Sequence, residues 1–582
     1  VLDDCLLNIK ANQGIDIVLE DLTLDDPKTY QLLSRGETLG VFQLDGGPMR
    51  QLLKSLSPDS FQDISAVIAL YRPGPMGENS HNLYADRKNN RKPVEPIHNE
   101  LSDSLQEILG DTYGLIVYQE QVMAIAQKVA GFSLGRADLL RKAMGKKNKE
   151  ILDKEYVPFE AGMKANGFST AAIKRLWDTL IPFSDYAFNR AHSAGYGVVS
   201  YWTAYLKANY PTEYMAALLT SVRDDKDKSA LYLSECRRMG IKVLSPDVNE
   251  SDAEYTPRGA DIRFGLAAIR NVGEGVVASI KSAREVKGRF TSFGDFLAKV
   301  DAQVCNKKTI ESLIKAGAFG SLGSTRKGLI AVHLEAIDSV IESKRAEAIG
   351  QFDLFGGEEV TAVSGLDIEI PEGEWEKSIL LAYEREMLGL YVSDHPLLGV
   401  EHVLRANTDL TISELVDDGA QNESIVTIGG LITSVVRKVS RQGASWAVVT
   451  VEDLEGSLEV LFFANTYNQY SITLIEDRIV TIRGRVDRRE DALRFTALEM
   501  SIPDIKSAPA GPLVISLPIA QCTPPVVERI KEILRSHPGK REVHLQLREN
   551  GSSTVMKVDA LITASPSLSA DLKSILGPNC LV

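Results

Sequence analysis

The spacing of apolar residues changes along the chain. Up to about residue 255 it is helical, as in "YQEQVMAIAQKVAGF" (118–132), where Val122, Ile125, Ala126 and Val129 recur every three or four positions. From about 256 to 345, short helical stretches are separated by glycines. From about 424 the period approaches two and β-branched residues dominate, which predicts strands. The pattern therefore predicts a multidomain α+β protein, helical first and richer in strands later.

Turn signals and composition divide these stretches into five predicted parts. "YRPGPMGENS" (71–80) is expected to be a turn or loop, because its prolines cannot continue a helix. Five short strands within about eighty residues favour an OB-fold barrel, and the last segment combines strands with one helix. The parts are a helical domain (1–255), a domain of short helices (256–360), an acidic linker with connecting helices (361–423), an OB-fold (424–505) and a small α/β domain (506–582).

Composition narrows the class of protein. The 582 residues are 44% hydrophobic and 25% charged, as in ordinary globular proteins, and no run of about eighteen apolar residues predicts a membrane span. The chain starts at Val1 without a signal-peptide pattern, so a cytoplasmic fragment of a longer protein is expected. Five scattered cysteines predict reduced, partly buried thiols and no zinc site. The net charge of −14 still permits local basic surfaces.

One basic and aromatic cluster suits a nucleotide. Arg141 and Lys142 stand beside a glycine that precedes Lys146 and Lys147, so the four cations can converge on a polyphosphate. A second stretch supplies Arg190 and His192. It continues into a predicted helix with the aromatic residues Tyr196, Tyr201, Trp202 and Tyr205. Aromatic rings can stack on bases while cations hold phosphates. The same residue types also fit a solvated basic helix face beside an aromatic core.

A glycine hairpin in "FGLAAIRNVGEGVVASIKSAREVKGRF" (264–290) predicts a helix-hairpin-helix pattern. Val272, Gly273, Glu274 and Gly275 form the turn, where backbone amides near a helix N-terminus can bind a DNA phosphate without reading sequence. The possible supporting cations are Lys281, Arg284 and Lys287. A plain tight turn is the alternative interpretation of this short motif.

The predicted barrel carries candidate residues for single-stranded DNA. The set combines cations with rings: Arg437, Lys438, Arg441, Trp446, Phe462 and Arg485. Stacked rings and cations are the usual means of holding single strands. The alternative is that Trp446 and Phe462 belong to the core and that the arginines are solvated.

A short apolar peptide stands in the acidic segment. Its residues are Gln351, Phe352, Asp353, Leu354 and Phe355, with glycines at 350, 356 and 357. Leu354 and Phe355 can fill an apolar pocket of a partner while Gln351 hydrogen-bonds at its rim. The pentapeptide resembles the motif by which replication proteins bind a sliding clamp.

Six motifs, in order, resemble the fingers region of the bacterial replicative DNA polymerase III alpha subunits, family C. They are "GVFQLDGGPMR", "IALYRPGPM", "YGLIVYQEQVM", "ADLLRKAMGKK", "FNRAHSAGYGVVSYWTAYLKANYP" and "EYMAALLTS". The resemblance extends over essentially the whole chain. It implies that Arg141 and Lys142 reach the triphosphate of the incoming nucleotide, with Lys146 and Lys147 as helpers. It also implies that Arg190, His192 and Tyr196 line the same cleft and that Arg72 lies in the adjacent loop.

The resemblance further implies partners and a cofactor. The 1–255 part would be the fingers domain, residues 351–355 would bind the sliding clamp, the OB-fold would hold single-stranded template, and residues 506–582 would contact the clamp-loader tau subunit. The family's catalytic carboxylates, which bind two magnesium ions, are expected upstream of Val1. Asp3 and Asp4 do not match that motif, so no metal is assigned to this chain and the chain alone is expected to be inactive.

Two other functions fit parts of the pattern. A non-catalytic DNA-binding scaffold that tethers partners to the clamp would need the same DNA and clamp contacts but no catalytic carboxylates upstream. A small-molecule enzyme could use the basic cluster for a phosphorylated substrate, and its DNA binding would not depend on salt. No hydrolase motif, EF-hand or P-loop pattern is found in the sequence.

Overall fold

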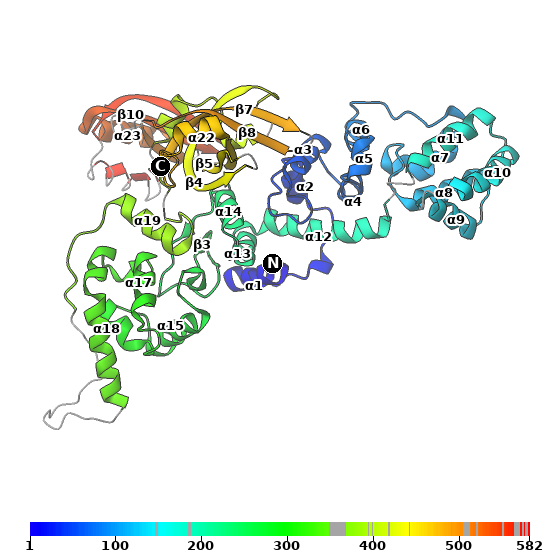
Figure 1. Cartoon of the computed structure of the whole chain (residues 1–582). Coiled ribbons are helices and arrows are strands. Elements are labelled where there is room, and N and C mark those ends of the chain that lie inside the picture. Colours follow the sequence, from blue (N-terminus) through cyan, green and yellow to red (C-terminus); the bar gives the residue numbers. More distant parts are fainter. Residues whose placement is uncertain are drawn as a thin grey trace. The chain divides into compact units, whose positions relative to one another are not determined.

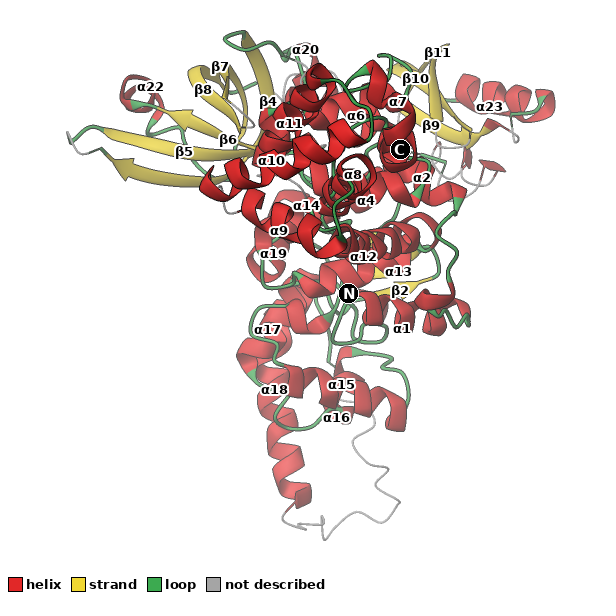
Figure 2. Cartoon of the chain, turned by 90° about the vertical axis from the view of Figure 1, so that its right-hand side faces the viewer, coloured by secondary structure: helices red, strands yellow, loops and turns green. Residues whose placement is uncertain are grey.

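The computed structural model describes most of the chain. The described residues are 1–145, 149–183, 188–348, 368–393, 395–397, 400–416, 420–440, 443–454, 456–489, 492–503, 512–519, 522–549, 552–563, 568, 571–572, 575–576 and 580–581. They form two compact units, Val1–Ser393 and Asp394–Val582 (Figure 1). Figure 2 shows that helices dominate the first unit and that the long strands β4 to β11 belong to the second.

Helices follow one another through the first 240 residues. They are α1 (Leu2–Gln13), α2 (Pro27–Ser34), α3 (Gly47–Leu56), α4 (Phe61–Leu70), α5 (Pro73–Gly77), α6 (Ser80–Lys88), α7 (Ser102–Leu109), α8 (Gln119–Ala130), α9 (Leu134–Gly145), α10 (Lys149–Ala165), α11 (Thr170–Phe183), α12 (Arg190–Asn209), α13 (Pro211–Ser221) and α14 (Lys226–Arg238). The prediction of a mostly helical first part is therefore confirmed.

The start of α8 follows from its sequence. The Gln121 side chain accepts the backbone N–H of Tyr118 at 3.0 Å, so the first turn is capped from within the motif. The apolar positions that predict this helix are buried. Gly131, with a φ of 68°, ends the helix in the left-handed conformation that glycine adopts without strain.

The proline-rich stretch after α4 departs from its prediction. A turn or loop was expected for residues 71–80, but Pro73–Gly77 form the short helix α5. Proline is tolerated here because it occupies the first helical position, where its missing N–H would have no intrahelical partner. The predicted break in the preceding helix is confirmed, since α4 ends at Leu70 and Arg72 has an extended backbone. Arg72 thereby becomes the N-terminal cap of a helix.

Helix α12 packs against helices from both earlier and later parts of the chain. It lies against α2, α4 and α13 (Figure 1). Tyr201 is fully buried, and its hydroxyl accepts the backbone N–H of Asp26 at 2.8 Å. The N-terminus of α12 is capped by Asn189, whose side chain accepts the N–H of His192 at 2.8 Å. The cap fixes the residue at which the basic and aromatic stretch becomes helical.

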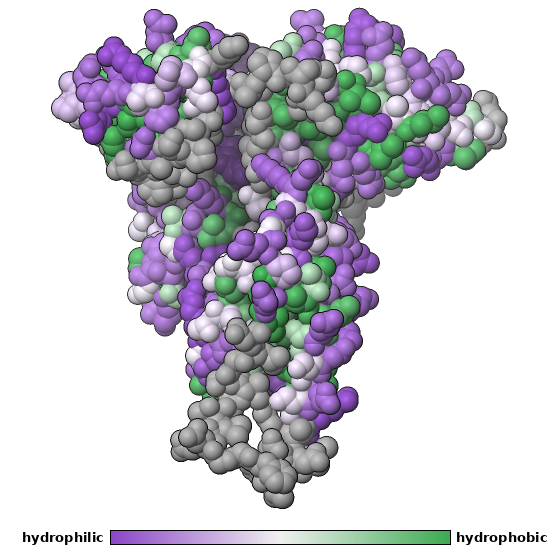
Figure 3. Space-filling view, turned by 90° about the vertical axis from the view of Figure 1, so that its left-hand side faces the viewer, coloured by the Kyte–Doolittle hydropathy of each residue, from purple (hydrophilic) through white to green (hydrophobic). Residues whose placement is uncertain are grey.

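The remainder of the first unit contains short helices, as the sequence predicts, but also the 23-residue helix α18, where only short helical stretches were expected. A small sheet in the order β1-β3-β2 precedes them, with strands β1 (Val243–Leu244), β2 (Thr256–Arg258) and β3 (Asp261–Arg263). The helices are α15 (Glu274–Lys287), α16 (Phe293–Lys299), α17 (Lys307–Lys315), α18 (Arg326–Ala348) and α19 (Lys377–Leu388). Buried rings of Phe290, Phe293, Phe296 and Phe319 pack edge to face in their core. On the face in Figure 3, hydrophilic and hydrophobic residues are interspersed over α17 and α18.

The second unit begins with two short helices and a closed barrel. The elements are α20 (Glu401–Ala406), α21 (Ile412–Val416), β4 (Ile425–Val439), β5 (Ser445–Glu452), β6 (Ser457–Phe462), α22 (Ala464–Tyr470), β7 (Ile479–Arg489) and β8 (Ala492–Ser501). The strand order β4-β5-β6-β8-β7 closes the barrel, which confirms the predicted OB-fold. Alternate residues of β5, Ala447, Val449 and Val451, are fully buried, as the period of two requires.

A second sheet follows the barrel. Strands β9 (Leu513–Pro518), β10 (Pro538–Glu549) and β11 (Ser552–Ile562) are arranged in the order β11-β10-β9, with β9 and β10 parallel. Helix α23 (Pro524–Ser536) makes the crossover between these two strands and has prolines in its first turn. The predicted combination of strands with a helix in the last segment is confirmed among the residues that the structure describes.

Candidate functional site

A single backbone contact brings two distant motifs together. Tyr118 and Phe188 form an isolated parallel bridge, in which Phe188 donates its N–H to Val117 O at 3.1 Å and accepts the N–H of Gln119 at 2.9 Å. This bridge places the first residues of α8 beside those of α12. The start of α8 and the predicted site residues at the start of α12 are therefore neighbours, although about seventy positions separate them in the chain.

Arg190 lies at this junction. Its guanidinium is 5.3 Å from the centre of the Tyr118 ring and 3.9 Å from the Asp111 carboxylate, and the side chain is 50% exposed. Its backbone N–H donates to both carboxylate oxygens of Glu120, at 3.0 and 3.2 Å. The backbone of Arg190 is thus fixed to α8, while its charged group stays accessible to a ligand.

A row of rings continues along α12. The Arg72 guanidinium lies 4.7 Å from the centre of the Phe188 ring. The ring centroids of Phe188 and His192 are 5.3 Å apart, and those of His192 and Tyr196 are 4.5 Å apart. Tyr196 then stacks on Phe42, at 5.9 Å and an interplanar angle of 24°. His192 and Tyr196 share one face of α12 because they are four residues apart. Arg72, His192 and Tyr196, all predicted site residues, therefore belong to one continuous row.

Arg141 and Lys142 approach this row from α9. Asp138 pairs with both cations, through Oδ1 to Arg141 Nη2 and through Oδ2 to Lys142 Nζ, each at 2.8 Å. Hydrogen bonds from Lys142 and Arg141 hold the pKa of Asp138 below its usual range. Arg141 also donates from Nη1 to the side-chain oxygen of Gln119 at 3.0 Å. Arg141 is thereby connected to the residue that bonds Phe188.

Buried hydroxyl groups form hydrogen bonds beneath the surface of the junction. The Tyr118 hydroxyl is 3.2 Å from Ser65 Oγ, and the Ser65 and Ser193 hydroxyl oxygens are 2.9 Å apart. Burial raises the pKa of the Tyr118 phenol, so the ring stays neutral beneath Arg190. A cavity of about 100 Å³ opens beside these groups; it is lined by Phe61, Gln62, Ser65, Ala66, Tyr84, Asp111, Thr112, Tyr118, Arg190 and Ala194.

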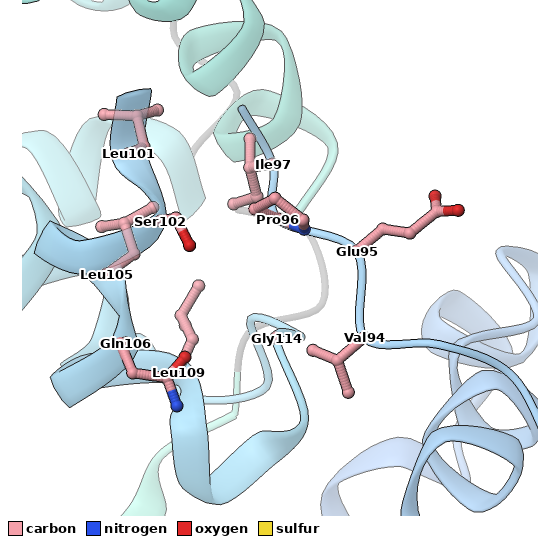
Figure 4. A pocket seen from close by; sticks show the side chains of 10 residues that line it. All are labelled: Val94, Glu95, Pro96, Ile97, Leu101, Ser102, Leu105, Gln106, Leu109 and Gly114. Carbon is pink, nitrogen blue, oxygen red and sulfur yellow. The ribbon is translucent and has the colours of Figure 1, made fainter. Parts of the chain in front are cut away.

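A second small cavity lies away from the predicted residues. It measures about 70 Å³ and is bounded by α7 and the segment 94–97 (Figure 4). Leu101, Leu105 and Leu109 form one wall, and the Glu95 carboxylate points away from the space. None of the residues that line this cavity is a Lys, Arg or His, so the lining provides no cation for a phosphate.

The glycine hairpin presents backbone rather than side chains. Gly273 is the N-terminal cap of α15, and a Cβ at Gly273 or Gly275 would have no heavy atom within 4 Å. Internal packing therefore does not require glycine at these positions, whereas an approaching phosphate would. Glu274 pairs with Arg223 at 3.2 Å, and the Val272 side chain is buried. The N–H groups of Val276 and Val277 donate to Gly273 O, at 3.0 and 3.2 Å, so the preceding amides at the start of α15, those of Glu274 and Gly275, are the groups best placed for a ligand.

The cations of α15 have internal partners. Arg284 donates to the carbonyl oxygens of Val248 and Ser251, at 3.2 and 2.6 Å, and to the Asp252 carboxylate at 3.0 Å. Lys281 also pairs with Asp252 at 3.0 Å, and Lys287 donates to Lys299 O at 2.7 Å. Lys281 is 46% exposed, but the Arg284 side chain is only 13% exposed. Arg284 therefore fixes the fold around α15, and Lys281 is better placed to meet a ligand.

Cross-strand register aligns three side chains on the barrel. Lys438 on β4 pairs with Trp446 on β5, and Ala447 pairs with Phe462, the last residue of β6. The row of Lys438 and Trp446 therefore continues to Phe463, which directly follows β6 and caps α22. Lys438 Nζ lies 5.3 Å from the centre of the Trp446 ring, and Trp446 stacks on Phe463 at 6.0 Å. Phe463 is 50% exposed, and Phe462 is fully buried. Phe462 is therefore a core residue, as the alternative interpretation of the barrel proposed. Phe463, not Phe462, is the ring in the exposed row.

Two of the three predicted barrel arginines are described by the structure, and they have different surroundings. Arg437 donates to Leu474 O at 3.2 Å. Arg485 is exposed on β7, where it pairs in register with Ile425 and Thr496. Lys146, Lys147, Arg441 and the pentapeptide Gln351–Phe355 lie outside the described residues.

Some residues at these sites are not in the predicted set. Phe42, Phe188 and Gln119 complete the junction, and Phe463 completes the barrel row. The doublet Phe462–Phe463 contains a usable signal, because strand alternation must direct one ring inward and the other outward. The sequence contains no comparable local signal for Phe42, which reaches Tyr196 only through tertiary packing.

The described residues contain neither a cluster suited to a metal ion nor a helix suited to crossing a membrane. Among the residues that the structure describes, no group of three or more His, Cys, Asp or Glu side chains could hold a metal ion. The described donor sets therefore do not fit a magnesium site. None of the described helices is both long and apolar enough to cross a membrane. Three of the five thiols, those of Cys5, Cys236 and Cys305, are buried in the first unit, and burial raises the pKa of Cys236 to about 12.

Family comparisons cover three parts of the chain. Residues 1–167 match the bacterial DNA polymerase III alpha subunit finger domain, residues 240–329 match a helix-hairpin-helix motif, and residues 426–508 match an OB-fold nucleic acid binding domain. The fold and these matches define a multidomain nucleic-acid-binding protein that contains a polymerase finger domain.

Curated relatives align with the whole chain. The DNA polymerase III subunit alpha of Mycobacterium tuberculosis H37Rv is 56% identical over 587 residues, which cover 100% of this chain and 50% of the relative. The subunit of Thermus aquaticus is 39% identical over 94% of this chain and 44% of its own length. That of Escherichia coli K12 is 35% identical over 96% and 48%. The chain belongs to the family of bacterial DNA polymerase III alpha subunits, and it spans about half the length of these relatives.

Proposed function

We propose that this chain is the fingers-to-C-terminus portion of a replicative DNA polymerase. In the full-length subunit it would bind the incoming deoxynucleotide and the DNA during template-directed synthesis, a nucleotidyl transfer. The junction of α8, α9 and α12 carries this proposal, because it assembles Arg141, Arg190 and Arg72 beside exposed rings. Three guanidinium groups suit a triphosphate, since each can bind phosphate oxygens in a bidentate manner.

The rings give the site a second property. His192, Tyr196 and Phe42 continue from the cations along α12, so an anion held at Arg190 would have aromatic faces beside it. A nucleotide combines these two chemistries, a polyphosphate and a flat base. A phosphorylated metabolite without a base would leave the row of rings unused. Lys142, Lys146 and Lys147 are proposed to add charge on the phosphate side.

DNA binding is assigned to two further surfaces. The amides of Glu274 and Gly275 at the start of α15, with Lys281 beside them, suit a duplex backbone. The row of Lys438, Trp446 and Phe463 suits a single strand, because its rings can stack on successive bases. Magnesium is proposed for the full-length subunit, and no step of the reaction is assigned to it within this chain.

The function is tested with the full-length natural subunit. Purified protein should extend a primer on a template and incorporate the complementary deoxynucleotide. A non-catalytic scaffold would bind the same DNA without extending it. Retained DNA binding together with absent extension, at saturating nucleotide and magnesium, would reject the polymerase assignment.

The barrel row has its own test. Trp446→Ala or Phe463→Ala should weaken binding of this chain to single-stranded DNA by about 1 to 3 kcal/mol, the usual contribution of one base stacked on a ring. Binding is measured by fluorescence anisotropy with a labelled oligonucleotide. Tyr470→Ala, on α22, is the control. Equal affinities for all three variants and the parent chain would remove the barrel from the DNA path.

The sliding clamp is proposed as the partner of residues 351–355. Leu354→Ala with Phe355→Ala should weaken binding to the purified clamp by more than about 2 kcal/mol, because these side chains are the expected anchors. Glu358→Ala with Glu359→Ala is the matched control, since it changes nearby residues without removing an anchor. Unchanged clamp affinity after the first double substitution would remove the assignment.

The terminal α/β domain is proposed to contact the clamp-loader tau subunit in the cytoplasm, where the polymerase would act on the nucleoid. Val555 and Met556 on β11 are exposed, at 54% and 44%, and can be changed without opening the core. Val555→Glu with Met556→Glu should weaken tau binding if this strand forms the interface. Equal binding of tau to parent and variant chains would move the contact to another surface.

A further inference from the structure

Arg141 is held from two sides. Its Nε and Nη2 donate to Asp138 Oδ1, at 2.9 and 2.8 Å, and its Nη1 donates to Gln119 Oε1 at 3.0 Å. Asp138 is on the same helix, so it fixes the side chain relative to α9 only. Gln119 is the first residue of α8 and provides an anchor on a different element. Three of the five guanidinium N–H groups are thus engaged by described residues, which leaves donor capacity for an external anion.

Gln119 is itself fixed to the start of α12. Its backbone N–H donates to Phe188 O at 2.9 Å, two residues before Arg190. The next residue, Glu120, accepts the backbone N–H of Arg190. The first turn of α8 therefore contacts both cation-bearing segments. The Gln119 side chain contacts Arg141, and the Gln119 backbone N–H and the Glu120 carboxylate contact the Phe188–Arg190 segment. This arrangement links the Arg141 guanidinium and the Arg190 backbone to the same end of α8.

We propose that Gln119 is a positioning residue for the triphosphate of the incoming nucleotide, holding the Arg141 guanidinium so that it faces the same anion as Arg190. The inference rests on the proposed function, because it deepens the assignment of that site. A long arginine side chain loses much conformational freedom when it is fixed. Gln119 imposes that order before the nucleotide arrives, so less of the binding free energy is lost on ordering.

A neighbouring glutamine separates positioning from folding. Gln121 is buried and accepts the backbone N–H groups of Val117 and Tyr118, at 2.8 and 3.0 Å, so its role is to cap α8. Gln119 is only partly buried, and its side chain contacts a charged group instead. Gln127 is exposed on the same helix and serves as the matched control. The same substitution at these three positions therefore has three different expected results.

The experiment measures binding of inorganic tripolyphosphate to this 582-residue chain by calorimetry, together with the thermal midpoint of each variant. Gln119→Leu should raise the Kd by about tenfold, comparable to the loss of one hydrogen bond to a charged group, with an unchanged thermal midpoint. Gln127→Leu should leave both unchanged, and Gln121→Leu should lower the midpoint. Because Gln119→Leu removes no charge, the dependence of the Kd on ionic strength should stay as in the parent chain.

Arg141→Ala distinguishes the inference from the function on which it rests. If Arg141→Ala abolishes tripolyphosphate binding and Gln119→Leu does not weaken it, the positioning role is wrong and the phosphate site stands. If Arg141→Ala binds as the parent does, the phosphate site itself is wrong. A fall in the thermal midpoint of Gln119→Leu as large as that of Gln121→Leu would assign Gln119 to folding alone. In the full-length polymerase, Gln119→Leu should raise KM for the nucleotide more than it lowers kcat.

Discussion

The junction of α8, α9 and α12 and the hairpin before α15 both contain cations, but the cations have different partners. At the junction, Arg190 and Arg72 lie against aromatic faces, and the Arg190 side chain is half exposed. In the α15 region, Arg284 donates to two backbone carbonyls and a carboxylate and is nearly buried. The first region thus offers side chains to a ligand, and the second offers backbone amides. Residue type alone does not distinguish these roles; the partners of each cation do.

The largest expected effect is at the junction. Arg141→Ala in the full-length polymerase should lower kcat/KM for nucleotide incorporation by about 100-fold, because a charge-assisted contact to the triphosphate is lost. Steady-state kinetics with a single-nucleotide primer extension measures it. Lys128→Ala on α8, an exposed residue that pairs with Glu107, should leave the kinetics unchanged. Parent-like kinetics for Arg141→Ala would move the phosphate site elsewhere and end the contrast between the two regions.

The next effect concerns stability around α15. Arg284→Met should lower the free energy of local opening of α15 by about 2 kcal/mol, because the carbonyl oxygens of Val248 and Ser251 lose their donor. Amide hydrogen exchange of α15 measures this local quantity. Lys281→Met, which removes only an exposed pair with Asp252, should change it by less than about 0.5 kcal/mol. Unchanged exchange together with weaker DNA binding would show that Arg284 serves the ligand instead.

The smallest effect tests the backbone surface. Gly275→Val should weaken duplex DNA binding about fivefold, because its side chain would stand where a phosphate approaches the amides of α15. A Cβ at this position has open space around it, so stability should not change. Gly275→Ala, the smaller change, should have a weaker effect on affinity. A loss of affinity that grows with side-chain size would support DNA binding by the backbone amides of α15. Equal affinities for the parent chain and both variants would contradict it.

Periodicity predicted the secondary structure well for a physical reason. The apolar positions of α8 and the alternation in β5 arise from burying one face of an element, which each segment encodes locally. The capped helix starts at Tyr118 and Asn189 are similarly local. The error at 73–77 was also local, because proline interrupts α4 but is well suited to the first position of a new helix.

The role of each candidate residue was less predictable. Arg284 and Lys281 are three positions apart on one helix and look equivalent in sequence, but only Arg284 lies against the carbonyls of Val248 and Ser251. Phe462 and Phe463 are adjacent, and the barrel buries only the first. The outcome in both cases depends on which surface packs against the element, and that surface comes from a distant part of the chain.

The sequence by itself determined the helical first part, the five-stranded barrel, the sheet and helix α23 of the last segment, and the motifs that place the chain in its family. Tertiary structure alone decided that Tyr118 bonds Phe188, that Gln119 meets Arg141 and that Phe42 stacks on Tyr196. Helices and strands follow from interactions within a few residues, so a local pattern records them. The contacts that assemble the site join residues up to about 150 positions apart, and only the packing of whole elements brings them together.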